Sequence, residues 1–104
     1  MSVKTRAKRF GIQMDLRYRL SGESKWRKGT TENISFSGVL FQAEESAKTS
    51  TPLEIRLELP AEILGVGCAE VDCKGIVIRS EGPKGAGAGP TLASTIARYR
   101  FIRP

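Results

Sequence analysis

Apolar and polar residues alternate along two long stretches of the chain, the pattern expected of half-buried β-strands. The first stretch, residues 12–20, places on one face Ile12, Met14, Leu16, Tyr18 and Leu20. The second, residues 52–60, has a proline at each end and turns inward Leu53, Ile55, Leu57 and Leu59. Because proline cannot donate a ladder hydrogen bond, Pro52 and Pro60 are expected to mark the limits of this strand.

The segments between and after these strands predict further short strands. Residues 21–24 supply a turn, and residues 25–31 are expected to return as a hairpin partner. Residues 33–38 are expected to form a structured turn before a strand at 39–41, and residues 44–51 a surface loop. A long strand at 69–80 has Gly75 at its middle, which permits a bend or bulge. A last strand is expected from Thr91 to about Phe101.

Strands joined mainly by short polar turns, with no helical period, indicate an all-β fold. We expect a small six-stranded antiparallel β-barrel, because a closed sheet has no exposed edges. The 104 residues suffice for a single domain. We expect a flexible basic arm at residues 1–9 and one barrel domain at residues 10–104. The glycine-rich stretch 82–89 is expected to be a mobile hairpin connection.

The positive charge of the chain is concentrated near its N-terminus. Residues 1–31 carry nine Lys and Arg against two acidic residues, a balance of 9 − 2 = +7, whereas the whole chain has 17 − 11 = +6. An anionic partner is therefore expected to bind in this region. The alternative is an arm that serves only solubility.

Composition argues against an enzyme and against a metal site. The chain has no histidine, the most common general acid–base and metal ligand. Cys68 and Cys73 are expected to be reduced core residues, in keeping with a cytoplasmic location. Lys84 is followed by glycine, so the glycine-rich stretch does not match a phosphate-binding P-loop. Glu54 and Glu58 are expected on the solvent face as ordinary surface charge. No apolar run is long enough to span a membrane as a helix.

The strongest candidate site joins Arg9, just before the first strand, to the sequence N33-I-S-F-S-G38. Asn33, Ser35 and Gly38 fit the pattern [D/N]xSxxG, and they follow a basic arm, an alternating strand and a hairpin. In this order of features the chain resembles the PilZ family of bacterial cyclic di-GMP receptors. The resemblance implies a PilZ-like barrel of the split-barrel type, no catalytic residue, no cofactor, and a ligand-binding site made by Arg6, Arg9, Asn33, Ser35 and Gly38.

The family's other motif, RxxxR, is incomplete. Four residues before Arg9 stands Thr5, and the nearest basic residues are Lys4 and Arg6. In the family pattern Arg9 would bind a phosphate or a guanine edge through its guanidinium fork, with Arg6 as a displaced second arginine. Asn33 can donate and accept toward a guanine edge, Ser35 offers a hydroxyl, and Gly38 lets the backbone approach closely.

Several simpler interpretations remain open for these residues. Arg9 can be a solvated surface side chain, and Asn33, Ser35 and Gly38 can serve only to shape a turn, the glycine through a positive φ. Ile34 and Phe36 are expected in the core, and Trp26 is expected to pack the barrel rather than stack on a ligand.

Three functions follow, in order of preference. The first is a receptor for cyclic di-GMP that acts on a protein partner in motility, pilus assembly or polysaccharide secretion. The second is a PilZ-fold interaction module that has lost nucleotide binding. The third is a basic barrel for single-stranded nucleic acid, which ranks last because such proteins expose aromatic side chains among their basic groups.

Overall fold

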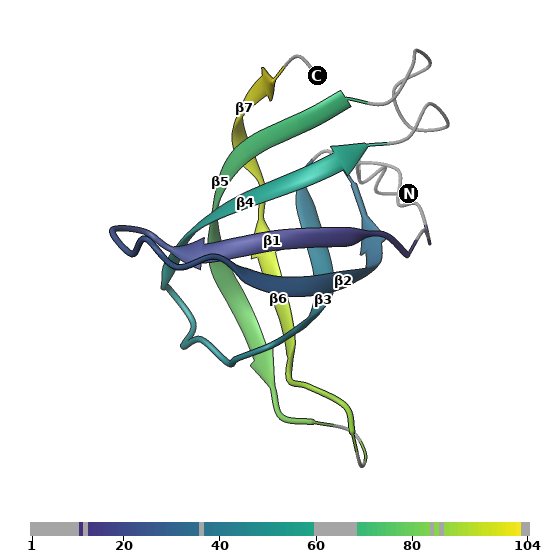
Figure 1. Ribbon diagram of the computed structural model, residues 1–104. Helices are drawn as coiled ribbons and strands as arrows, with labels where there is room; N and C mark the ends of the chain where they lie inside the picture. The colour runs from purple at the N-terminus through teal and green to yellow at the C-terminus, as the bar shows by residue number, and fades with distance from the viewer. Residues whose placement is uncertain are drawn as a thin grey trace, which may run out of the picture.

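The computed structural model describes residues 11, 13–35, 37–59, 69–83, 85 and 87–102, all of them in strands, turns and loops (Figure 1). The strands are β1 (Asp15–Leu20), β2 (Arg27–Ile34), β3 (Gly38–Ala43), β4 (Pro52–Leu59), β5 (Ala69–Glu81), β6 (Thr91–Thr95) and β7 (Ala97–Ile102). Within these residues no helix has the length and apolar character needed to cross a membrane.

Six of the strands close into a ring. The sheet order is β4-β1-β2-β3-β6-β5-β7, and an additional pairing of β4 with β5 joins the ends of the first six. Every pairing is antiparallel. The predicted all-β fold with a six-stranded antiparallel barrel is therefore confirmed, and β7 is an additional strand placed beside β5 (Figure 1).

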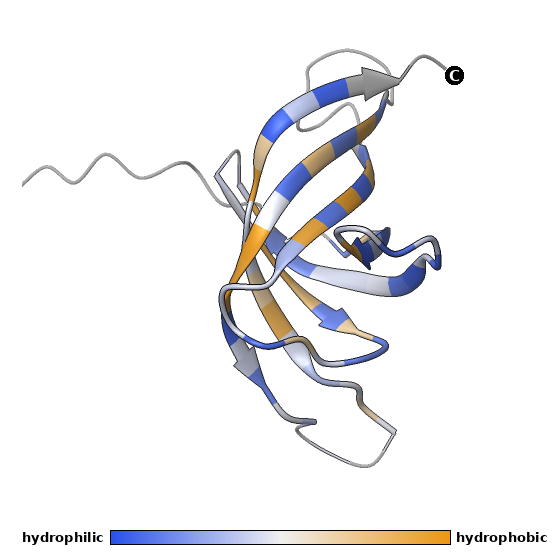
Figure 2. Cartoon of the chain, turned by 90° about the vertical axis from the view of Figure 1, so that its left-hand side faces the viewer, coloured by the Kyte–Doolittle hydropathy of each residue, from blue (hydrophilic) through white to orange (hydrophobic). Residues whose placement is uncertain are grey.

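The core lies inside this ring and follows the predicted alternation. Blue and orange residues alternate along several strands in Figure 2, as expected of strands that turn one apolar face inward. Tyr18 and Phe41 meet at the centre with ring centroids 5.3 Å apart. The predicted core residues confirmed as buried are Leu16, Tyr18, Ile34, Leu53, Ile55 and Leu57, with Met14 and Leu20 packed against them. Ile12 and Phe36 lie outside the described residues.

The prediction of one uninterrupted last strand is wrong, because the strand breaks at Ile96. β6 pairs with β3 and with residues 77–81 of β5, whereas β7 pairs with residues 70–74 of β5. Gly75 lies between these two sets of pairs. A Cβ atom at this position would collide with the Thr95 carbonyl oxygen and the Ser94 hydroxyl. The absence of a side chain at Gly75 thus allows β5 to approach the β6–β7 junction closely. The bulge in β5 lies at Ile78 and not at Gly75, which keeps regular pairing with Leu53.

Trp26 was predicted to pack the barrel, and this prediction is wrong. Its ring is partly buried and lies against the guanidinium groups of Arg19 and Arg56, at 4.4 and 4.9 Å from the ring centroid. Arg56 also forms a two-pronged ion pair with Asp72. Trp26 therefore joins a cationic cluster on the outer face of β1, β4 and β5.

Cys73 is a free, buried thiol, as predicted, and burial raises its pKa to about 12. Cys68 lies outside the described residues.

Candidate functional site

The motif Asn33-x-Ser35-x-x-Gly38 forms the turn between β2 and β3. The Ser35 amide donates to the Gly38 carbonyl at 2.9 Å. The Ser35 hydroxyl accepts from the Gly38 amide at 3.2 Å and from the Ser37 amide at 3.3 Å. With its residue only 8% exposed, this hydroxyl is engaged within the turn. The structure therefore gives Ser35 a turn-shaping role.

Gly38 owes its identity to a close approach and not to a positive φ. The described glycines with positive φ are Gly22 and Gly87, so that part of the turn interpretation is wrong. A Cβ atom on Gly38 would lie 3.2 Å from the carbonyl oxygen of Ser94 in β6. Glycine at this position lets β3 and β6 meet closely at the start of their ladder.

Asn33 lies on the outer face of the barrel. The strand registers place in one row across four strands Asn33, Leu40, Ala93 and Arg79. The neighbouring row, Ile34, Val39, Ser94 and Val77, is buried. Since successive residues of a strand point to opposite faces, the row of Asn33 faces outward. An amide and a guanidinium group therefore stand at the two ends of one apolar strip.

A hollow of about 300 Å³ lies beside this strip. It is lined by Gly38, Val39, Leu40, Ile78, Arg79, Ala93 and Ser94. Ile78 is the extra residue of a bulge in β5 and is 61% exposed. The sequence analysis missed Ile78 and Arg79 as site residues, because their proximity to Gly38 depends on the pairing of β3 with β6 and of β6 with β5. The signal in the sequence was an isoleucine at an outward position.

The residues just before β1 lie beside β2, the strand that carries Asn33. The Met14 amide donates to the Thr31 hydroxyl, and the Thr31 amide donates to the Met14 carbonyl, both at 2.9 Å. Arg9 is five residues before Met14, so the chain can carry it at most about 17 Å from there. Arg6 and Arg9 themselves lie outside the described residues, and their part in the site stays a prediction.

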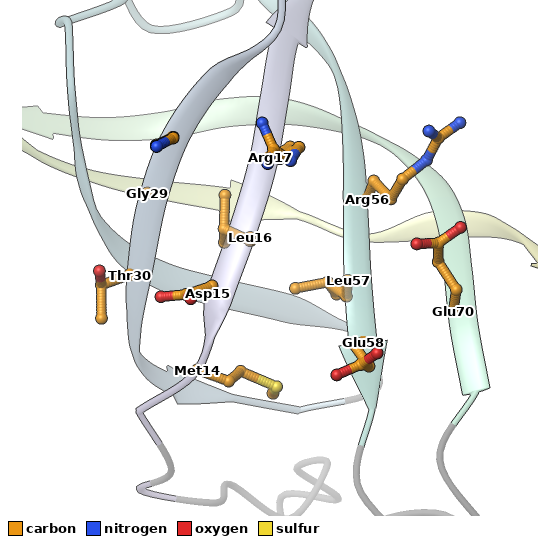
Figure 3. A pocket seen from close by; sticks show the side chains of 11 residues that line it. Met14, Asp15, Leu16, Arg17, Gly29, Thr30, Arg56, Leu57, Glu58 and Glu70 are labelled. Atoms are coloured by element: carbon orange, nitrogen blue, oxygen red, sulfur yellow. The ribbon is translucent and has the colours of Figure 1, made fainter.

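A second, larger hollow of about 570 Å³ lies on the outer face of β1, β2 and β4 (Figure 3). Its lining mixes cations, such as Arg17 and Arg56, with the carboxylates of Asp15, Glu58 and Glu70. Of the predicted site residues that the structure describes, Asn33, Ser35 and Gly38, none lines it. Because the carboxylates oppose a phosphate-bearing ligand, this hollow is not part of the candidate nucleotide site.

Comparison with known families decides what this arrangement is. The family model of the PilZ domain matches residues 4–96, which include most of the arm, the motif and the whole six-stranded ring. The chain belongs to the PilZ domain family. PilZ domains are receptor and adaptor domains for cyclic di-GMP and are known as non-enzymatic binding domains.

One solved structure supports the same PilZ fold. It is the crystal structure of the PilZ domain of CeSA from a cellulose-synthesizing bacterium, with a TM-score of 0.58 and 22% identity over 88% of this chain and 82% of that chain. No curated protein sequence matches the chain.

Proposed function

We propose that this PilZ domain is a non-enzymatic receptor that binds cyclic di-GMP on the outer face of β2, β3, β6 and β5. The observation that carries the proposal is the row from Asn33 to Arg79 beside the hollow at Gly38. It offers an amide for a guanine edge, an apolar strip for the flat bases and, for a phosphate, the guanidinium group of Arg79, which a ligand would draw from its 3.6 Å ion pair with Glu81. Arg6 and Arg9 of the arm supply the remaining positive charge.

In this proposal Ser35 acts as a positioning residue. Its hydroxyl bonds fix the turn that holds Asn33 and Gly38 relative to each other. Binding would draw the arm onto the barrel and change the surface presented to a partner protein. A receptor for an intracellular second messenger works in the cytoplasm, where the reduced, buried Cys73 is also expected.

Calorimetric titration with cyclic di-GMP at low salt tests the proposal. Saturable binding is expected, and Arg9→Ala and Arg79→Ala should each weaken it roughly tenfold or more, because hydrogen bonds to charged groups contribute about 1.5–3 kcal/mol. Arg17→Ala is the matched control, an exposed arginine that lines the other hollow. The absence of both heat and thermal shift at millimolar nucleotide would reject the ligand.

The second candidate function, an interaction module without a nucleotide, is favoured by Thr5 at the first arginine position of RxxxR. The variant Thr5→Arg separates the two. A receptor should gain affinity from the added guanidinium group. A module that has lost binding should show none as wild type and acquire it in the variant.

A further inference from the structure

β7 stands outside the closed six-stranded ring. The match to the PilZ model ends at residue 96, and β7 begins at Ala97. Among the described residues β7 pairs with β5 alone, so its other edge has no strand beside it. Figures 1 and 2 both show β7 at the rim of the molecule with β5 on its inner side. In the described part of the chain, the closed sheet therefore gains one open edge at β7.

The backbone of β7 carries a bulge. Asp72 pairs with Arg100 and Lys74 pairs with Ala97, so Arg98 and Tyr99 together oppose the single residue Cys73. Arg98 has a φ of 54°, in the left-handed region that a residue with a side chain seldom adopts. Bulges occur at sheet edges, where they redirect a side chain.

Positive charge collects where β7 adjoins β5 and β4. A small pocket of about 110 Å³ is lined by Trp26, Glu54, Ile55, Asp72, Cys73, Lys74, Arg98 and Arg100. Its two carboxylates are already engaged, Asp72 by Arg56 at 2.7 Å and Glu54 by Arg19 at 3.1 Å. Within the described part of the chain, the three exposed cations Lys74, Arg98 and Arg100 form no ion pair. The pocket therefore has basic groups in excess.

We infer that the open edge of β7 binds an acidic, extended segment of a partner protein. The segment adds a strand to the sheet through main-chain hydrogen bonds, and one of its carboxylates reaches the pocket between Lys74, Arg98 and Arg100. A second copy of this chain fits less well, because antiparallel pairing of two β7 strands brings the arginines of both copies together. Nucleic acid also fits less well, since the Trp26 ring, on which a base would stack, already lies against two arginines.

A fluorescent nine-residue peptide of alternating glutamate and valine is the probe, with fluorescence anisotropy as the measurement. Saturable binding to the whole chain is expected, and the double variant Arg98→Glu/Arg100→Glu should weaken it at least tenfold. The matched control Arg17→Glu/Lys28→Glu reverses two exposed cations on β1 and β2 and should change it less than threefold. Circular dichroism checks that both variants are folded.

Main-chain recognition is tested by methylating every second amide of the peptide, which leaves its charge unchanged. Two peptides, one for each set of alternate amides, cover both faces of the strand, and at least one should bind tenfold more weakly. The inference would be overturned if both methylated peptides bound as tightly as the unmethylated one, or if the Arg98→Glu/Arg100→Glu variant bound the peptide as tightly as the wild type. The absence of any binding at millimolar peptide and low salt would also overturn it. So would sedimentation showing a dimer that the double variant dissociates, or an oligothymidine that binds this edge more tightly than the peptide. Neither peptide result depends on cyclic di-GMP.

Discussion

The two ends of β2 lie at two corners of the barrel whose polar side chains have different roles. At its start, Arg27 binds Glu23 at 2.7 Å and Glu45 at 2.6 Å, and the Tyr18 hydroxyl both donates to and accepts from the Glu45 backbone. At its end, the turn uses Ser35 for its own hydrogen bonds, while Asn33 faces outward beside a hollow. The first corner is a network that holds two loops together. The second, in our proposal, presents a polar side chain to a ligand.

Both corners belong to the same closed barrel. The largest expected effect on its stability is at the place where β5 meets the β6–β7 junction. Gly75→Ala places a methyl group against the backbone of Thr95, so one of the two strands must move. We expect a loss of at least about 3 kcal/mol in the free energy of unfolding, measured in urea. The control Gly82→Ala meets open space and should be close to neutral. Equal stability of the two variants would contradict the tight crossing.

Tyr18→Phe tests the first corner. The substitution removes the hydroxyl that serves both the amide and the carbonyl of Glu45, and the unpaired groups should cost about 1–3 kcal/mol of stability. Affinity for cyclic di-GMP should not change, because Tyr18 lies inside the barrel. A variant of normal stability but weakened nucleotide binding would reverse the roles given to the two corners.

Ser35→Ala tests the second corner with a smaller effect on stability, about 1 kcal/mol, together with several-fold weaker nucleotide binding. The control is Ser37→Ala, whose hydroxyl has one long contact of 3.4 Å with that of Ser35. Unfolding in urea and calorimetric titration on the same two variants give both quantities. If Ser37→Ala weakened binding more than Ser35→Ala, Ser35 would not be the residue that positions the turn.

The smallest expected effect is on the pH dependence of stability. Burial raises the pKa of Tyr18 above its ordinary value, so above about pH 10 the unfolded chain ionises first and the native state loses stability as the pH rises. The Tyr18→Phe variant has no ionisable group at this position. The stability advantage of the wild type over the variant should therefore narrow above about pH 10, as followed by urea unfolding at several pH values. A constant difference would mean that the phenol titrates alike in both states.

Strand positions were predictable from the sequence because burial repeats every second residue. Leu53, Ile55 and Leu57 show this most clearly. The all-β class followed from the absence of any helical period, and the barrel from the closure of the sheet edges. The break at Ile96 was not predictable, because it depends on contacts with β5, a distant segment. Trp26 was misplaced for a related reason: its cationic neighbours belong to β1 and β4.

The candidate site divides in the same way. Asn33, Ser35 and Gly38 were predictable from the motif, since its three positions are close in sequence. Ile78 and Arg79 approach it only through the ladders that join β3, β6 and β5. These two residues could not be predicted, because the register between strands that are distant in sequence is not encoded in a local motif.

The Ile96 amide donates a hydrogen bond of 3.0 Å to the carbonyl of Ser37. This bond joins the turn of residues 35–38 to the residue from which β7 departs. We therefore expect nucleotide binding at the turn, as proposed, to affect β7, and a strand added to β7 to affect the turn. Thermodynamic linkage makes such a connection reciprocal, so the effect of nucleotide on peptide affinity must equal the effect of peptide on nucleotide affinity.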